Sequence, residues 1–162
     1  MRFSERISLA QSKGWEVLLD AAAFVPTNGL DLSRWRPDFV DLSFYKMFGL
    51  PTGVGALLVR KDKLPLLRRP AFFGGTVEYV GVGFQTHILK KGHGGFEDGT
   101  LDYLSIPAVE IGLRFLKQVP GALPFQRWVG GFNCSVAFHG TSFTHIPAVC
   151  IKKRLCCIFI CS

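Results

Sequence analysis

Residues 38–60, DFVDLSFYKMFGLPTGVGALLVR, contain the clearest structural signal in the chain. Residues 38–43 and 54–60 are each predicted to form a strand, because both are short, apolar and rich in residues that favour strands. The segment between them ends in Gly-Leu-Pro-Thr-Gly (49–53), a combination typical of a turn. Runs of apolar residues with little alternation predict strands buried on both faces, which is the pattern of an α/β sheet.

Upstream of this segment the sequence predicts one helix and one further strand. Residues 2–13 form an amphipathic pattern that ends at Gly14, a residue that commonly terminates helices. Residues 15–19 are apolar and favour a strand, which ends at Asp20. We therefore expect a helix followed by a strand of the same sheet as residues 38–60.

Downstream, the glycine-rich residues 61–99 are predicted to be loops supported by the sheet. Residues 101–119 are predicted to form a helix that ends at Pro120-Gly121; Pro107 falls inside its first turns and marks an alternative start. Residues 120–162 show neither the helical nor the strand period, so we expect an irregular, basic and cysteine-rich tail.

Composition excludes several classes of protein. The chain has 162 residues, is 48% hydrophobic and carries a net charge of +7, which fits one globular domain. The six basic residues after residue 110 are too dispersed to predict a nucleic-acid groove, and no apolar run approaches the roughly 20 residues of a membrane span. Five cysteines, an odd number, argue against a secreted disulfide framework, so we expect a cytoplasmic protein.

Two charged residues follow directly on predicted strands: Asp20 after residues 15–19, and Lys46 after residues 38–43. A pyridoxal phosphate site needs such a pair, since a lysine amine condenses with the cofactor aldehyde and a carboxylate keeps the pyridine nitrogen protonated. An ordinary ion pair at the edge of a strand would show the same spacing.

Longer motifs distinguish these alternatives through a family resemblance. Three segments together resemble the cofactor-lysine region of the molybdenum cofactor sulfurases, a branch of the class-V aminotransferase and cysteine desulfurase family: residues 20–28, 30–33 and 38–60. Residues 73–77 and 95–100 resemble two later motifs of the same family, in the same order. The resemblance covers residues 1–119. It implies an α/β fold, namely part of the large domain of a fold-type-I pyridoxal phosphate-dependent transferase, and leaves residues 120–162 unassigned.

The resemblance also implies roles for individual residues. Lys46 corresponds to the Schiff-base lysine and Asp20 to the partner of the pyridine nitrogen. Ser43 and Tyr45 fall where related enzymes bind the cofactor phosphate. Thr100 falls where a threonine of the partner subunit reaches that phosphate in related dimers. The implied substrates are L-cysteine and the molybdenum cofactor, and the implied assembly is a homodimer.

Parts of the family site have no counterpart in the sequence. We find no match to its amino-terminal phosphate-binding loop, to its substrate-binding arginine or to its persulfide cysteine. The alternative prediction is therefore an incomplete, catalytically inactive chain that acts only as a binding or dimerisation module.

The tail offers two weaker signals. Cys134, His139, His145 and Cys150 are potential zinc ligands, although they lack the close Cys-x-x-Cys pairs typical of zinc sites, and no metal site is predicted. The basic cluster at 152–154 and the cysteines that follow could form an acylated membrane contact. An apolar tail packed on the domain explains the same residues, and no membrane association is expected.

Overall fold

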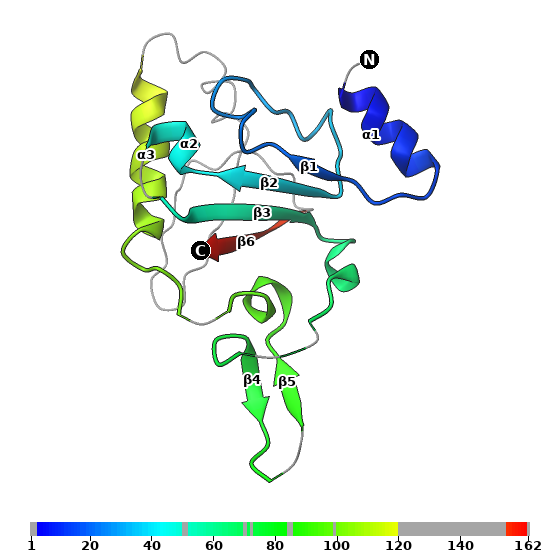
Figure 1. Cartoon of the computed structure of the whole chain (residues 1–162), viewed down its shortest axis with the longest axis vertical. Helices are drawn as coiled ribbons and strands as arrows, with labels where there is room; N and C mark the ends of the chain where they lie inside the picture. Colours follow the sequence, from blue (N-terminus) through cyan, green and yellow to red (C-terminus); the bar gives the residue numbers. More distant parts are fainter. Residues whose placement is uncertain are drawn as a thin grey trace.

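The computed structural model shows a four-stranded sheet, bordered by helices, and a separate two-stranded hairpin (Figure 1). The residues that the structure describes are 3–49, 52–69, 71, 73–83, 86–98 and 100–119, together with the backbone of 155–161.

The sheet has the strand order β1-β2-β3-β6. Strand β1 (Leu18–Asp20) is parallel to β2 (Phe39–Ser43), whereas β3 (Val54–Arg60) is antiparallel to both β2 and β6 (Leu155–Cys161). Strands β1, β2 and β6 therefore run in one direction and β3 runs against them, which makes the sheet mixed.

The predictions for β2 and β3 agree with the structure to within one residue. The expectation that their strands are buried on both faces is wrong for β2, in which buried residues alternate with half-buried ones. The reason is that the core lies on one face of β2, where Val40 and Leu42 pack with Ala21, Val25 and Ile106.

The first strand begins later than the apolar pattern predicts. The amide of Trp15 donates to the carbonyl of Ala10 at 3.1 Å and so belongs to the end of helix α1 (Phe3–Ser12). Gly14, with φ +81°, reverses the chain there, as predicted for a helix terminus. Pairing in register with β2 starts at Leu18. The amide of Val17 donates to the Asp38 side chain at 2.8 Å, and its carbonyl accepts from the amides of Asp38 and of Phe39, the first residue of β2.

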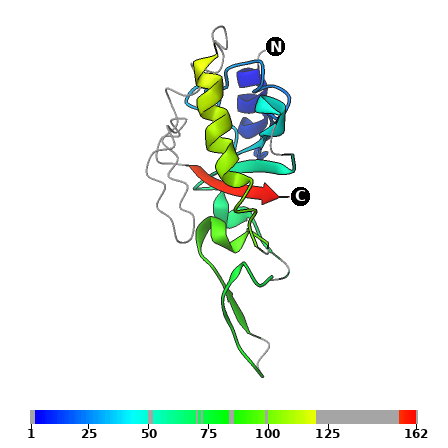
Figure 2. The ribbon, with the colours of Figure 1, turned by 90° about the vertical axis from the view of Figure 1, so that its left-hand side faces the viewer.

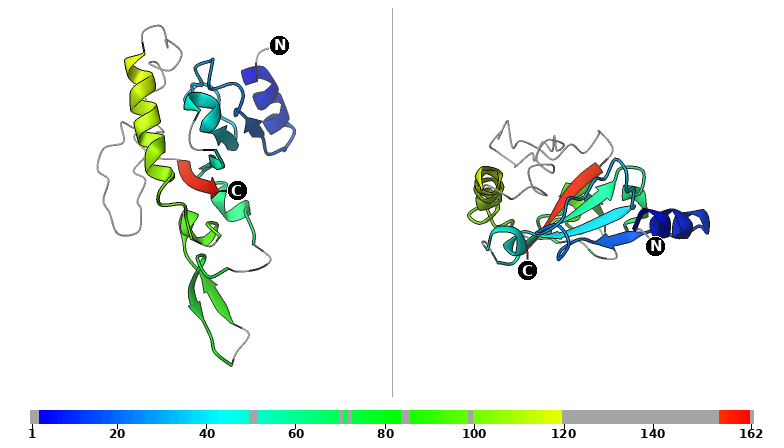
Figure 3. Two further views of the ribbon diagram at one scale, coloured as in Figure 1. Left: turned by 60° about the vertical axis from the view of Figure 1, so that its left-hand side comes forward. Right: turned by 90° about the horizontal axis from the view of Figure 1, so that it is seen from above.

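Two helices lie side by side at the end of the sheet opposite α1 (Figures 1 and 3). The short helix α2 (Tyr45–Phe48) follows β2 directly and ends at Gly49, which has φ +83°. Helix α3 (Ile106–Gln118) begins five residues later than the predicted Leu101, at the alternative start next to Pro107. The two helices approach so closely that a Cβ atom on Gly112 would lie 2.3 Å from the ring of Phe48.

Residues 61–99 contain more regular structure than the glycine-rich sequence predicts. Two 3-10 turns, η1 (Leu64–Leu66) and η2 (Gly92–Gly95), flank a hairpin of β4 (Val77–Val80) and β5 (His87–Leu89). The hairpin projects from the body of the molecule in Figures 1 and 2 and in the left panel of Figure 3. The prediction of loops alone was wrong here, because four-residue and three-residue strands are too short for a clear alternation.

The expectation of an irregular tail was also wrong for its last residues. Leu155–Cys161 form β6, which pairs with β3 from Leu155 opposite Arg60 to Cys161 opposite Val54. The zinc candidates Cys134, His139, His145 and Cys150 lie outside the described residues. Among the helices that are described, none is long and apolar enough to cross a bilayer.

Candidate functional site

The predicted site residues Asp20, Ser43 and Lys46 meet at one end of the sheet. Asp20 is the last residue of β1 and pairs in register with Asp41 of β2, two residues before Ser43. Lys46 follows in the first turn of α2. Because β1 and β2 are parallel, their carboxyl ends lie at the same edge, which is where α/β sheets commonly bind ligands.

Helix α2 presents Lys46 to solvent while its neighbours anchor the helix. Lys46 and Tyr45 are both exposed, and the Lys46 Nζ atom lies 5.9 Å from the centre of the Tyr45 ring. Phe44, just before the helix, is buried in the core and stacks on Phe48 with ring centres 6.3 Å apart. The amide of Phe44 donates to the carbonyl of Val54 in β3 at 3.2 Å. The base of α2 is therefore fixed, and its polar side chains are accessible.

The carboxylate of Asp20 is exposed, and one of its oxygens has a local role. Asp20 Oδ1 accepts the amide hydrogen of Ala22 at 3.0 Å, which shapes the turn after β1. No bond to Asp20 Oδ2 occurs among the described residues. Asp41, directly opposite in the register, adds a second carboxylate that the sequence argument did not single out.

Thr100 lies in a different part of the chain from these residues. It is exposed and follows η2, five residues after Gly95, the last residue of that turn. Within the described part of the chain, no hydrogen bond or ion pair joins Thr100 to Asp20, Ser43 or Lys46. Its assignment to the phosphate site stays a prediction.

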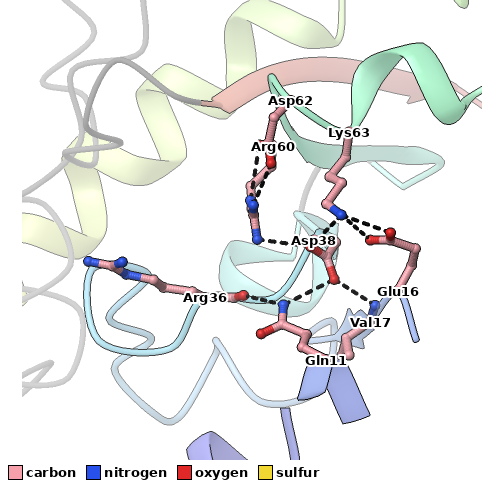
Figure 4. Close-up of polar contacts among 8 residues, drawn as sticks. All are labelled: Gln11, Glu16, Val17, Arg36, Asp38, Arg60, Asp62 and Lys63. Atoms are coloured by element: carbon pink, nitrogen blue, oxygen red, sulfur yellow. Dashed lines mark hydrogen bonds and ion pairs between the residues drawn. The ribbon is translucent and has the colours of Figure 1, made fainter. Parts of the chain in front are cut away.

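The opposite end of the sheet contains a buried polar cluster centred on Asp38 (Figure 4). Asp38 is 1% exposed, and its Oδ2 atom accepts from the amide of Val17 at 2.8 Å and from the side chain of Gln11 at 3.0 Å. Its Oδ1 atom pairs with Arg60 at 2.9 Å and lies 3.7 Å from Lys63 Nζ. The cluster joins α1, the residues before β1, β2 and the end of β3.

The pKa of Asp38 is lowered by this cluster. Burial opposes ionisation and would raise the pKa, but the hydrogen bonds from Gln11 and Val17, with the charges of Lys63 and Arg60, outweigh it. Because every donor comes from the fold itself, Asp38 has a structural role.

A third polar centre, at Arg69, was not predicted from the sequence. The Arg69 Nη1 atom donates to the carbonyl of Phe96 at 3.1 Å, and Nη2 pairs with Asp98. The guanidinium also lies over the ring of Phe73, 5.3 Å from its centre. Arg69 has no distinctive sequence signal, because its partners lie up to 29 residues away in the chain.

The residues at the carboxyl ends of β1 and β2 fit pyridoxal phosphate by their chemistry. One edge of the sheet contains an exposed amine, a carboxylate with one oxygen that accepts no hydrogen bond from the described residues, and two hydroxyl groups. They belong to Lys46, Asp20, Ser43 and Tyr45. These are the groups that hold the aldehyde, the pyridine nitrogen and the phosphate of that cofactor. In the described part of the chain, no three His, Cys, Asp or Glu side chains cluster as metal ligands.

Comparison with known proteins supports the same family. The model of the family described as aminotransferase class-V matches residues 2–122. Proteins named molybdenum cofactor sulfurase are 45% identical over 117 residues in Caenorhabditis elegans, 46% over 110 residues in Homo sapiens and 48% over 147 residues in Drosophila persimilis. These matches cover 72%, 67% and 89% of this chain but only 16%, 12% and 18% of the relatives. The resemblance inferred from the motifs is thereby confirmed.

Solved structures share the fold. A cysteine desulfurase from Thermococcus onnurineus NA1 aligns with a TM-score of 0.62 and 24% identity, covering 72% of this chain and 29% of that one. The cysteine desulfurase CsdA from Escherichia coli aligns with a TM-score of 0.66 and 22% identity, covering 78% and 31%. The predicted fold class, part of the large α/β domain of fold-type-I transferases, is confirmed. The domain boundary after residue 119 stays a prediction.

Proposed function

The chain belongs to the class-V aminotransferase family, and on this premise we propose that it binds pyridoxal 5'-phosphate through Lys46. The observation that carries the proposal is the shared position of Lys46, Ser43 and Asp20 at the carboxyl ends of two parallel strands. A structural ion pair between Asp20 and Lys46 is the competing explanation. No such pair forms among the described residues, so these side chains are available to a ligand.

In the proposed site each residue has one task. The Lys46 amine holds the cofactor covalently and, once released, carries protons to and from the substrate. The Asp20 carboxylate would accept a hydrogen bond from the protonated pyridine nitrogen. The hydroxyls of Ser43 and Tyr45 would donate to the phosphate, and Thr100 would donate to the phosphate of the cofactor in the other subunit of the homodimer. When bound, the cofactor supplies an electron sink for the substrate.

The substrates are proposed from the names of the relatives. Identities of 45–48% to proteins named molybdenum cofactor sulfurase favour L-cysteine as sulfur donor and the molybdenum cofactor as acceptor. The chain spans less than a fifth of those relatives, so the complete reaction requires groups beyond those described here. Assembly as a homodimer and a cytoplasmic location are parts of the same proposal.

An absorbance titration tests cofactor binding. Purified full-length chain is titrated with pyridoxal 5'-phosphate, and a band of lysine-bound cofactor is expected near about 420 nm. Reduction with borohydride followed by peptide mapping then identifies the modified lysine, expected to be Lys46. The variant Lys46→Ala should lose the band, whereas Lys61→Ala, which removes another exposed lysine, should keep it.

Two results would contradict the proposal. A band that persists in Lys46→Ala, with label spread over several lysines, would indicate nonspecific reaction of surface amines. The absence of a band from wild-type chain that circular dichroism shows to be folded would exclude the cofactor site in this chain.

The second candidate function is a binding module without catalysis. It is favoured by apolar side chains exposed along one stretch of the chain: Leu104 is 91%, Ile111 69% and Phe115 61% exposed. Large exposed apolar groups commonly mark interaction surfaces. Light scattering and the absorbance titration together test this function. A mass above 18.0 kDa that falls in Phe115→Lys, in a chain that shows no cofactor band, would support it, whereas a mass unchanged by the substitution would not.

A further inference from the structure

Arg69 joins two segments that are far apart in the sequence. Arg69 follows η1, and its side chain is only 15% exposed. It donates a hydrogen bond to the Phe96 carbonyl and forms an ion pair with Asp98, both of which follow η2. A guanidinium can serve both groups at once because its donors lie in one plane with fixed directions. The end of this segment is therefore held at two points, a carbonyl and a carboxylate.

The other segment is the turn of residues 73–76. The Arg69 guanidinium lies over the ring of Phe73, the first residue of this turn. The Thr76 hydroxyl closes this turn, accepting the Phe73 amide hydrogen at 3.0 Å and donating to the Phe73 carbonyl at 2.9 Å. The Thr76 carbonyl accepts the amide hydrogen of Lys90 at 2.8 Å, just after β5. The turn is thus rigidly attached to the hairpin, and Arg69 is sandwiched between it and Asp98.

Asp98 is two residues before Thr100, with one glycine between them. Two residues of extended chain span at most roughly 7 Å, and glycine adds conformational freedom. The position of the Thr100 hydroxyl therefore depends on where Asp98 is held. Two other contacts hold this half-buried segment to η2: the Phe96 amide donates to the His93 carbonyl at 2.8 Å, and His93 Nδ1 lies 2.9 Å from Glu97 Oε1. The Arg69 contacts are the ones that join Phe96 and Asp98 to the turn of residues 73–76.

We propose that Arg69 is a positioning residue that holds the segment 96–98 so that Thr100 can donate to the phosphate of the cofactor bound in the other subunit of the proposed homodimer. The inference rests on the proposed function, and it adds a residue that does not itself contact the cofactor. Its effect should be specific to the phosphate group, since Lys46 and Asp20 lie on other elements.

The test compares pyridoxal 5'-phosphate with pyridoxal, which lacks the phosphate, as ligands of the full chain. The variant Arg69→Lys keeps the positive charge but cannot serve a carbonyl and a carboxylate in one plane. We expect its affinity for pyridoxal 5'-phosphate to fall about tenfold, the effect of losing one charge-assisted hydrogen bond. Its affinity for pyridoxal should change by less than about twofold, within the scatter of surface substitutions.

Two further variants sharpen the test. Arg68→Lys, a change at the exposed neighbouring arginine, should leave both affinities unchanged. Thr100→Ala should lower the affinity for pyridoxal 5'-phosphate as Arg69→Lys does, and the double variant should lose little more. Such non-additivity is expected when both substitutions remove the same interaction.

The outcomes separate the inference from the proposed function. If wild-type chain binds neither ligand at Lys46, the proposed function fails and this inference fails with it. If wild-type chain binds the phosphorylated cofactor but Arg69→Lys loses both ligands equally, or adds fully to Thr100→Ala, only the inference is overturned. Should Arg69→Lys not fold, Asp98→Asn removes the same ion pair at a half-exposed residue and must show the same phosphate-specific loss.

Discussion

The two ends of the central sheet use their polar residues in opposite ways. At the Asp38 end, a carboxylate that is 1% exposed receives hydrogen bonds or charges from four residues of the fold (Figure 4). At the Lys46 end, Lys46 and Asp20 are both exposed. Among the described residues, the Asp20 carboxylate accepts one hydrogen bond, from the Ala22 amide.

The difference in burial between Asp38 and Asp20 indicates which polar residues stabilise the fold. A buried carboxylate destabilises a protein unless its oxygens are bonded, so Asp38 and its donors form one interdependent cluster. Exposed groups at the other end contribute little to stability and are available for a ligand. Stability and cofactor binding should therefore respond to substitutions at opposite ends of the same strands.

The largest effect on stability is expected for Asp38→Ala. The substitution leaves the buried Val17 amide without its side-chain acceptor, removes one of the two acceptors of Gln11 Nε2 and removes the buried one of the two carboxylate partners of Arg60. The expected loss is about 3 kcal/mol in the free energy of unfolding. Urea denaturation measures this loss. The matched control Asp62→Ala removes the more exposed partner of Arg60 and should cost less than about 1 kcal/mol. Equal losses in the two variants would contradict the structural role of the Asp38 cluster.

A smaller effect is expected in the dependence of stability on pH. The pKa of Asp38 lies below its ordinary value of 3.8, so the folded chain binds the proton more weakly than the unfolded chain does. The resulting stabilisation is complete above about pH 3.8 and is lost as the pH falls through the lower pKa of the folded state.

Comparison with Asp38→Asn isolates this contribution. The midpoints of urea denaturation are measured as the pH is lowered from about 5, through the range in which carboxyl groups titrate. These midpoints should fall more steeply for wild type than for the variant. Asp31 and Asp102, whose pKa values hydrogen bonds also lower, are present in both proteins. Parallel curves would show that Asp38 does not contribute to acid sensitivity.

The smallest effect on stability is expected at the other end, for Asp20→Asn. The amide oxygen can still accept the Ala22 hydrogen, so the free energy of unfolding should change by less than about 0.5 kcal/mol. The same variant should weaken binding of pyridoxal 5'-phosphate, because a neutral amide does not stabilise a protonated pyridine nitrogen. If Asp20→Asn lost as much stability as Asp38→Ala, the two ends of the sheet would contribute equally to stability, and the proposed difference between them would be contradicted.

Local sequence signals predicted much of this fold correctly. The span of β3, Val54–Arg60, agrees residue for residue, and α3 begins beside Pro107. These elements have strong local determinants, namely an apolar run bounded by a turn and a proline that favours the first helical turn. The order of Asp20, Ser43 and Lys46 after their strands also follows from the chain alone.

Other features depend on contacts between distant residues and were missed or misplaced. β1 starts at Leu18 because Trp15 is bound to α1, and β6 forms because β3 offers it a pairing edge. The roles of Asp38 and Arg69 likewise depend on partners 20 or more residues away. No periodicity within a short window can indicate such pairs.

The sequence by itself determined the family, the existence of strands β1, β2 and β3 and the types of residue at their ends, because propensity and motif spacing act within a few positions of the chain. Only the tertiary structure decided that β1 and β2 run parallel, so that Asp20, Ser43 and Lys46 share one edge, and that Asp38 is enclosed while Lys46 is accessible. Burial and pairing are properties of the packed chain, and they separate a carboxylate that holds the fold from one that is free to bind a cofactor.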